Sequence, residues 1–198
     1  SHELKTPIAL IQGYAEGLQD NITEDAESRQ FYCDVIVDEA NKMNRLEQKL
    51  LTLNQLEFGT DQVVMERFDL AAVIRGVVES SRILIEQKEA KVQLQMEESM
   101  PVWGDEFKVE QVITNYLTNG LNHLDGERIL TISCTHEGGR EKIWVKFYKV
   151  DKARTRAYGG SGIGLSIVKA IMESMNQEYG VRNREDGVEF WFTLEEKE

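Results

Sequence analysis

Residues 24–57 read EDAESRQFYCDVIVDEANKMNRLEQKLLTLNQLE, a stretch without glycine or proline. Within it Ile36, Met43 and Leu50 recur every seven residues, and Leu46 and Leu53 occupy the intermediate positions. Apolar residues at this spacing line one side of an α-helix and form the seam through which helices pair. The stretch therefore predicts one long amphipathic helix that needs helical partners.

A second helix is predicted over residues 2–19. Its apolar stripe consists of Leu4, Ile8, Ile11, Tyr14 and Leu18. The connection over residues 20–24 is short and polar, and Asn21 or Thr23 can cap the helix that follows. Two helices joined this tightly form an antiparallel hairpin, which cannot enclose a core alone but can do so in a four-helix bundle. We therefore expect a homodimer built on residues 1–58.

The pattern changes after Gly59 and Thr60, and residues 61–198 are expected to form an α/β sandwich. Short apolar or alternating runs predict strands, and longer amphipathic runs predict helices. The expected strands are residues 62–67, 91–96, 129–135, 142–147, 179–182 and 188–193, and the expected helices are residues 69–88, 105–124 and 162–175. This order predicts a mixed sheet with helices on one face, so the chain as a whole is of the α+β class.

Composition narrows the range of functions. The net charge of −12 argues against nucleic-acid binding, which needs clustered Lys and Arg. Cys33 and Cys134 lie far apart without metal-ligand spacing, which favours free thiols in a reducing compartment. No apolar run reaches the length that crosses a bilayer. Because no Met precedes Ser1, we expect the chain to be a piece of a longer protein.

The string His2-Glu3-Leu4-Lys5-Thr6-Pro7 carries a candidate nucleophile. On a helix His2 and Thr6 are neighbours on one face, and Pro7 removes the hydrogen bond that the Glu3 carbonyl would accept, which predicts a bend. Glu3 can accept from one ring N–H of His2 and leave the lone pair of the other nitrogen free to attack. Taken alone, His2 fits an ordinary surface histidine better.

Two further strings suggest phosphate chemistry. Asn115 and Asn119 are one helical turn apart, so their carboxamide oxygens can ligate Mg²⁺ together, although such a pair is more often merely exposed. Residues 159–169, GGSGIGLSIVK, place glycines before a helix start, where backbone N–H groups can bind phosphate. A basic run with Lys146, Lys149, Lys152, Arg154 and Arg156 precedes them.

Together these strings resemble the sensor histidine kinases. Residues 2–7 are similar to the H-box (HE-x-x-TP), and residues 111–119 are similar to the N-box (QVL-x-N-LL-x-NA). Residues 147–168 resemble the F-box, the nucleotide lid and the G2-box in that order. Three departures follow the N-box: Gly120 replaces the usual Ala, Asn122 replaces a common Lys, and His123 stands where an aromatic residue or His is common.

The resemblance implies a role for each matching residue. His2 would accept the γ-phosphoryl group of ATP, Glu3 would act as its base or orient it, and Thr6 would position water for a reverse phosphatase reaction. Asn115 and Asn119 would hold Mg²⁺ and phosphate oxygens. The remaining expected nucleotide contacts are Asn122, His123, Lys149, Arg154, Arg156, Gly160, Gly162, Gly164 and Leu165. The phosphoryl group would then pass to an aspartate of a response regulator, and the parent protein would be a membrane sensor of which this chain is a cytoplasmic portion.

One family box is missing. Between the N-box and the F-box the family carries Asp-x-Gly-x-Gly, whose Asp reads the adenine amino group, but here Lys146 is followed directly by Phe147. Three explanations are open: a mobile loop left out of the sequence, a deliberate deletion, or a natural loss in a kinase that binds nucleotide poorly. Two other functions therefore compete with a kinase, namely a dimeric binding scaffold with a degenerate ATP domain and an ATPase that forms no phosphohistidine.

Overall fold

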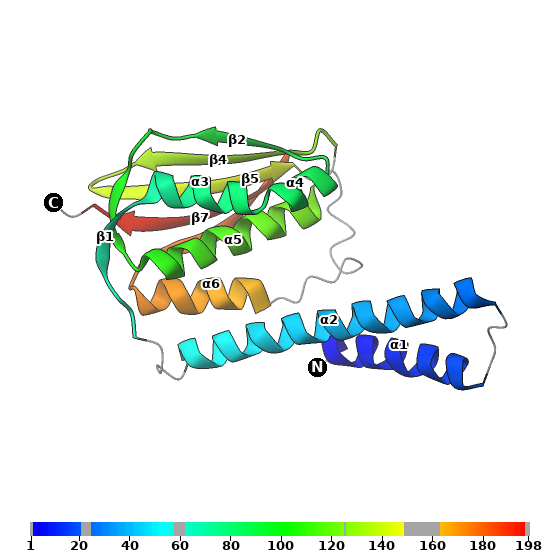
Figure 1. Ribbon diagram of the computed structural model, residues 1–198. Helices are drawn as coiled ribbons and strands as arrows, with labels where there is room; N and C mark the ends of the chain where they lie inside the picture. Colours follow the sequence, from blue (N-terminus) through cyan, green and yellow to red (C-terminus); the bar gives the residue numbers. More distant parts are fainter. Residues whose placement is uncertain (1, 21–24, 58–61, 125, 149–162, 197–198) are drawn as a thin grey trace. The chain divides into compact units, whose positions relative to one another are not determined.

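The computed structural model describes residues 2–20, 25–57, 62–124, 126–148 and 163–196, except for the side chains of residues 2, 3, 49, 56, 57 and 148 (Figure 1). It divides into two compact units, Ser1–Asn54 and Gln55–Glu198. The predicted α+β class is confirmed, with a helical hairpin followed by a mixed sheet and its helices. No helix within the described ranges has the length and apolar character needed to span a bilayer.

The hairpin consists of α1 (His2–Gln19) and α2 (Ala26–Glu57). Asp25 caps α2, because its carboxylate accepts hydrogen bonds from the backbone N–H and the hydroxyl of Ser28, both at 2.7 Å. The predicted caps Asn21 and Thr23 lie outside the described residues. At the same end of the hairpin, the rings of Tyr14 and Tyr32 meet edge to face at 4.9 Å.

The hairpin leaves much of its apolar surface uncovered. Large apolar side chains that are exposed in this unit are Ile8, Leu10, Phe31, Val37, Leu50 and Leu51. Of the predicted seam, Ile36, Met43, Leu46 and Leu53 are half-buried, whereas Leu50 is 42% exposed. Exposed Cys33 also lies on α2, and both cysteines are free thiols.

The second unit is built on a seven-stranded sheet in which only β2 and β4 run parallel among the recorded pairs. The strand order is β1-β3-β7-β5-β4-β2, and β6 pairs with β7. The strands are β1 (Glu66–Asp69), β2 (Lys91–Gln95), β3 (Pro101–Gly104), β4 (Ile129–His136), β5 (Arg140–Tyr148), β6 (Tyr179–Arg184) and β7 (Gly187–Glu195).

Four helices lie on one face of the sheet (Figure 1). They are α3 (Leu70–Ser80), α4 (Arg82–Gln87), α5 (Glu106–His123) and α6 (Ile163–Ser174). Alternate strand residues supply the sheet side of the core, because successive side chains of a strand point to opposite faces. The core residues of the three central strands are Leu130, Ile132, Ile143, Val145, Phe147, Phe190, Phe192 and Leu194.

Three details differ from the predictions. The first strand was predicted at residues 62–67 but covers residues 66–69, which pair with β3. The predicted helix over residues 69–88 is divided at Ser81, whose ψ of 3° departs from helical geometry. Strand β3 was not predicted, because Pro101 and Gly104 at its two ends are residues typical of turns.

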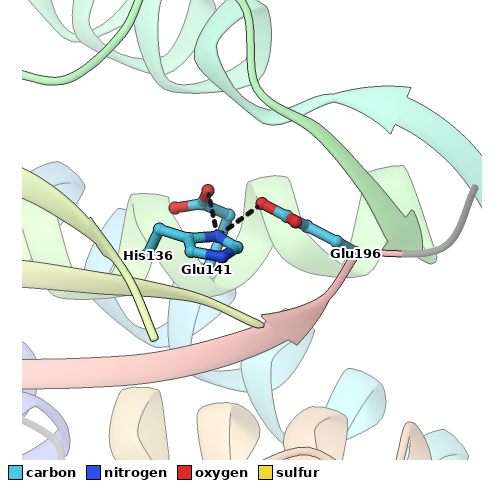
Figure 2. Close-up of side chains that lie close together, drawn as sticks. All are labelled: His136, Glu141 and Glu196. Carbon is cyan, nitrogen blue, oxygen red and sulfur yellow. Dashed lines mark hydrogen bonds and ion pairs between the residues drawn. The ribbon is translucent and has the colours of Figure 1, made fainter. Parts of the chain in front are cut away.

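A polar cluster joins the end of β7 to the hairpin of β4 and β5 (Figure 2). The Nδ1 atom of His136 lies 2.8 Å from Oε1 of Glu196 and 3.5 Å from Oε1 of Glu141. The hydrogen bond to Glu196 is the main cause that raises the pKa of His136, whereas burial raises the pKa of Glu141. The two carboxyl groups thus favour the protonated form of the imidazole that lies between them.

The first prediction concerns Asp69, which caps α3. Its Oδ1 accepts hydrogen bonds from the backbone N–H of Ala71 at 3.0 Å and of Met100 at 2.8 Å. Asp69→Ala should lower the free energy of unfolding by about 0.5–2 kcal/mol, as expected for a lost helix cap, while Asp69→Asn should lose less because it keeps an acceptor. Urea denaturation measures the difference.

The effect of Asp69→Ala should also depend on pH. The hydrogen bond from Met100 is the main cause that lowers the pKa of Asp69, so its contribution is present above the ordinary carboxyl pKa and is lost as the pH falls through the folded-state value. A wild-type advantage that stayed constant into strong acid would contradict this account of the cap.

The second prediction concerns the cluster of His136, Glu141 and Glu196. Because the pKa of His136 is raised in the folded state, its stabilisation is complete below the unfolded value of about 6.5 and is lost as the pH rises through the folded value. Raising the pH from about 5.5 to about 8.5 should therefore weaken the wild type more than His136→Gln. Urea midpoints across this range test the difference, and equal slopes in the two proteins would refute it.

Candidate functional site

Helix α5 presents the two candidate asparagines. Its N-terminus is held by buried Asp105, whose carboxylate accepts hydrogen bonds from the backbone N–H of Lys108 at 3.1 Å and of Val64 at 2.9 Å. One side of the helix packs against β5, α3 and α6. Asn115 and Asn119 lie one turn apart and are half-buried. The helix was predicted at residues 105–124 and is found at residues 106–123, so the spacing on which the Asn pair depends is confirmed.

Asn115 meets the start of the glycine-led helix α6. Its Nδ2 donates to the carbonyl of Gln111 at 2.9 Å, and no hydrogen bond from another described residue is recorded to its acceptor atom Oδ1. A Cβ placed on Gly164 would lie only 3.0 Å from that Oδ1. The glycine thus permits α6 to begin directly beside the asparagine oxygen, and a side chain here would fill that space. This arrangement fits a phosphate group with its metal ion, since the metal ion binds oxygen ligands such as the carboxamide oxygen and phosphate binds the N–H groups of a helix start.

The other predicted nucleotide contacts are only partly described. Leu165 is exposed in the first turn of α6. In the last turn of α5, Asn122 is exposed and His123 is half-buried. Lys149, Arg154, Arg156, Gly160 and Gly162 lie outside the described residues.

At the end of β5 the side chain that follows Lys146 is Phe147, and it is 3% exposed. Its Cδ1 atom lies 3.2 Å from the position of a Cβ on Gly120, and Leu130 Cδ1 lies 2.6 Å from the same position. The ring also stacks on Phe190 with a centroid distance of 5.8 Å. By the resemblance this ring is the first residue of the F-box, so the Asp-x-Gly-x-Gly box has no counterpart between it and Lys146.

The candidate phosphoacceptor lies in the first turn of α1. The side chains of His2 and Glu3 are outside the described residues, Thr6 is exposed, and Pro7 is buried inside the helix. The helix continues through Pro7, so His2 and Thr6 keep the one-turn spacing that the sequence predicts.

The cluster of His136, Glu141 and Glu196 was not predicted as a group. Its donor atoms all lie within 4.8 Å of one another, close enough to share a cation as well as a proton. It lies at the far end of β5 from Phe147, because Arg140 pairs with Glu195 at one end of the strand and Tyr148 pairs with Gly187 at the other. The sequence pattern that could have predicted this cluster is weak, because Glu196 is distant in sequence from His136 and Glu141.

Two family profiles match the chain. The first is the His Kinase A (phospho-acceptor) domain, over residues 1–59. The second is the histidine kinase-, DNA gyrase B- and HSP90-like ATPase, over residues 104–198. Together they cover His2, the Asn pair and the glycine-rich segment.

Individual relatives agree with the profiles. Sensor protein kinase WalK of Staphylococcus epidermidis is 28% identical over 214 residues, which cover 98% of this chain and 35% of that protein. Sensor protein SrrB of Staphylococcus aureus is 29% identical over 204 residues, covering 92% of this chain and 34% of that protein. The chain thus spans about a third of the length of these curated relatives. The first alignment is longer than the 198 residues of this chain, so that relative has residues without a counterpart here.

Solved structures share the fold. Histidine kinase AdeS of Acinetobacter baumannii superposes with a TM-score of 0.78 at 23% identity, over 100% of this chain and 98% of that one. Histidine kinase ThkA, in its complex with response regulator protein TrrA, gives a TM-score of 0.78 at 22% identity, over 99% of this chain and 59% of that one. With both domains matched in the same order, the chain belongs to the sensor histidine kinases.

Proposed function

We propose that this chain is the catalytic core of a sensor histidine kinase, in which ATP phosphorylates His2. Residues 1–58 act as the dimerisation and phosphotransfer domain, and residues 61–198 act as the ATP-binding domain. The observation that carries the proposal is the closeness of Asn115 Oδ1 to Gly164, where an added Cβ would lie only 3.0 Å away, because it brings the N-box helix beside the start of the glycine-led helix as a phosphate site requires. Both residues belong to the second unit, so a single domain provides this arrangement.

The reaction is an in-line phosphoryl transfer. The lone pair of one His2 ring nitrogen attacks the γ-phosphorus of ATP, an N–P bond forms, and the bond from phosphorus to the bridging oxygen breaks, so ADP leaves with that electron pair. Glu3 accepts the N–H of the other ring nitrogen and stabilises the positive charge that the ring gains. Thr6, one turn away, is suited to position water for the reverse hydrolysis. Catalysis here depends mainly on position and charge neutralisation.

The residues present are suited to one Mg²⁺ ion. The carboxamide oxygens of Asn115 and Asn119 would hold it, since Mg²⁺ prefers oxygen ligands and keeps several waters. When bound, the ion neutralises charge between the β- and γ-phosphates. Among the expected nucleotide contacts, Lys149, Arg154 and Arg156 would add positive charge beside the phosphates.

The partners follow from the same assignment. The phosphoryl group passes from His2 to an aspartate of a response-regulator receiver domain; the structural relative ThkA is known in complex with such a regulator. We also propose that the hairpin pairs with a second copy, because its exposed apolar residues need a cover. We further propose that the longer parent is a membrane sensor; the curated relatives are named as sensor proteins.

A second candidate function is a dimeric binding scaffold whose ATP domain no longer supports catalysis. The observation that favours it is that Lys146 and Phe147 are consecutive residues of β5, which leaves no place for the family's Asp-x-Gly-x-Gly box between them. The scaffold retains the hairpin pairing and predicts no phosphorylation of His2.

The third prediction tests the phosphoacceptor. His2→Gln should abolish incorporation of label from γ-labelled ATP, because the nucleophilic nitrogen is lost, while MgATP binding by calorimetry stays at the wild-type level. His136→Gln is the matched control, since this histidine lies at the other end of the sheet from Phe147, and it should keep wild-type labelling. Acid-stable label, or label that persists in His2→Gln, would show that the nucleophile is another residue. An unlabelled wild type that still dimerises would favour the scaffold.

The fourth prediction tests the dimer. Leu50 is 42% exposed and lies on the heptad seam, so Leu50→Glu should place a charge in the bundle and shift the chain toward the monomer by at least about tenfold in dissociation constant. Gln48→Glu makes a similar change at an exposed position off the seam and should leave the dimer intact. Sedimentation equilibrium measures both, and dimers of equal strength would place the interface elsewhere.

A further inference from the structure

Three side chains with metal-binding atoms meet at one end of the sheet (Figure 2). They are His136 at the end of β4, Glu141 near the start of β5 and Glu196 directly after β7. The imidazole and the two carboxyl groups point toward one another. The set differs from a simple group of acidic side chains, because it offers a nitrogen ligand as well as oxygen ligands.

The backbone fixes the positions of these three residues. His136 and Glu141 are directly opposite each other in the ladder of β4 and β5, so their side chains lie on the same face of the sheet. The turn between them has φ values of 62° at Gly138 and 77° at Gly139, the left-handed geometry of a tight hairpin turn. The backbone N–H of Glu196 donates to the carbonyl of Gly139 at 3.0 Å, which anchors the end of β7 to the same turn.

The separations of the ligand atoms suit a tetrahedral transition-metal ion. Nδ1 of His136 lies 2.8 Å from Oε1 of Glu196 and 3.5 Å from Oε1 of Glu141. Zinc binds imidazole nitrogen and carboxylate oxygen at about 2.0–2.2 Å, so two ligands of a tetrahedral zinc ion lie about 3.3–3.6 Å apart. The Glu141 distance falls in this range, and a small rotation of the exposed Glu196 side chain brings the other distance into it.

The cluster contains more negative than positive charge. The ligand atoms of the two carboxyl groups lie within 4.8 Å of each other, and Glu141 is only 8% exposed. Two carboxylates this close repel each other, and burial makes an unbalanced charge costly. A proton on Nδ1 of His136 forms a normal hydrogen bond to Glu196 at 2.8 Å, whereas Glu141 at 3.5 Å is beyond that range. A divalent cation among the three groups would contact both carboxylates at once.

The basic residues beside Glu141 on its own strand do not balance this charge. Arg140 and Lys142 flank Glu141, and because side chains alternate along a strand, both lie on the other face of the sheet. There Arg140 Nη1 lies 3.6 Å from Oε1 of Glu178, and Lys142 Nζ lies 4.8 Å from the ring centroid of Trp144.

We propose that His136, Glu141 and Glu196 form a binding site for a divalent transition-metal ion of the zinc class. Nδ1 of the imidazole and one oxygen of each carboxyl group supply three ligands, and water completes the tetrahedral set. The nitrogen ligand favours zinc over Mg²⁺ and Ca²⁺, which prefer oxygen ligands.

The ion would tie the end of β7 to the hairpin of β4 and β5 and so stabilise the second unit. It would take no part in phosphoryl transfer, because His136 pairs with Glu141 at one end of the ladder and Leu130 pairs with Phe147 at the other, beside Gly120 of the N-box helix. The pH dependence described above for the cluster belongs to the metal-free chain, since zinc and the proton bind the same Nδ1.

The test is a calorimetric titration with zinc chloride on the full 198-residue chain, freed of metal by EDTA and dialysis. The wild type should bind zinc with a dissociation constant below about 100 μM, and excess MgCl₂ should not displace the zinc. His136→Gln and Glu141→Gln should each weaken binding by at least about tenfold, because each removes a ligand. Glu137→Gln is the matched control: its side chain is 65% exposed and lies 3.9 Å from Lys142, so it should bind as the wild type does.

Thermal unfolding gives a second measurement. Zinc at about one hundred times its dissociation constant should raise the Tm of the wild type by at least about 5 °C, because the ion stabilises the folded state that binds it. His136→Gln should show no such shift. If circular dichroism shows that Glu141→Gln is unfolded, Glu196→Gln, at an exposed position, takes its place. A wild type that binds no zinc, or equal binding by the wild type and His136→Gln, would overturn the proposal.

Discussion

Helix α5 buries one whole side against β5 and the helices α3 and α6. Its fully buried apolar residues are Val109, Val112, Ile113, Tyr116, Leu117 and Leu121. So much apolar area holds the helix at one rotation about its axis, because turning it would expose these side chains at a cost of about 1.5–3 kcal/mol each. That single rotation directs Asn115 toward Gly164 and Gly120 toward Phe147. The closeness of Asn115 to Gly164 and the packing of Gly120 against Phe147 therefore both derive from the packing of one helix.

Much of this arrangement is predictable from the sequence, because it depends on local periodicity. The repeat of apolar residues located α1, α2, α5 and α6 within a few residues, and the one-turn spacing of Asn115 and Asn119 follows directly from helical geometry. The missed elements depend on contacts that are distant in sequence. Strand β3 is a strand because β1 and β7 pair with it, and the cluster of His136 with Glu196 exists because β7 ends beside the hairpin of β4 and β5. Neither fact has a local signal.

At Gly120 the packing of the core explains a departure from a family motif. Read alone, Gly120 is a small departure from an N-box. In the structure Gly120 lies in an apolar contact in which Leu130 and Phe147 occupy the volume that a methyl group at position 120 would need. Overpacking of a buried site costs about 1–3 kcal/mol, so a glycine is favoured once the ring is in place. A residue that differs from the family motif in this way reflects the packing around it as well as the chemistry of the site.

The two cysteines differ in the reactivity of their thiols. Burial raises the pKa of the Cys134 thiol to about 12, so almost none of it is thiolate near neutrality. Cys33 stands exposed on α2. Thiol-directed reagents should therefore attach at Cys33 in preference to Cys134, and one spin label or fluorophore per chain can be placed on the hairpin without mutating a residue. Such a probe would report distances between paired hairpins directly.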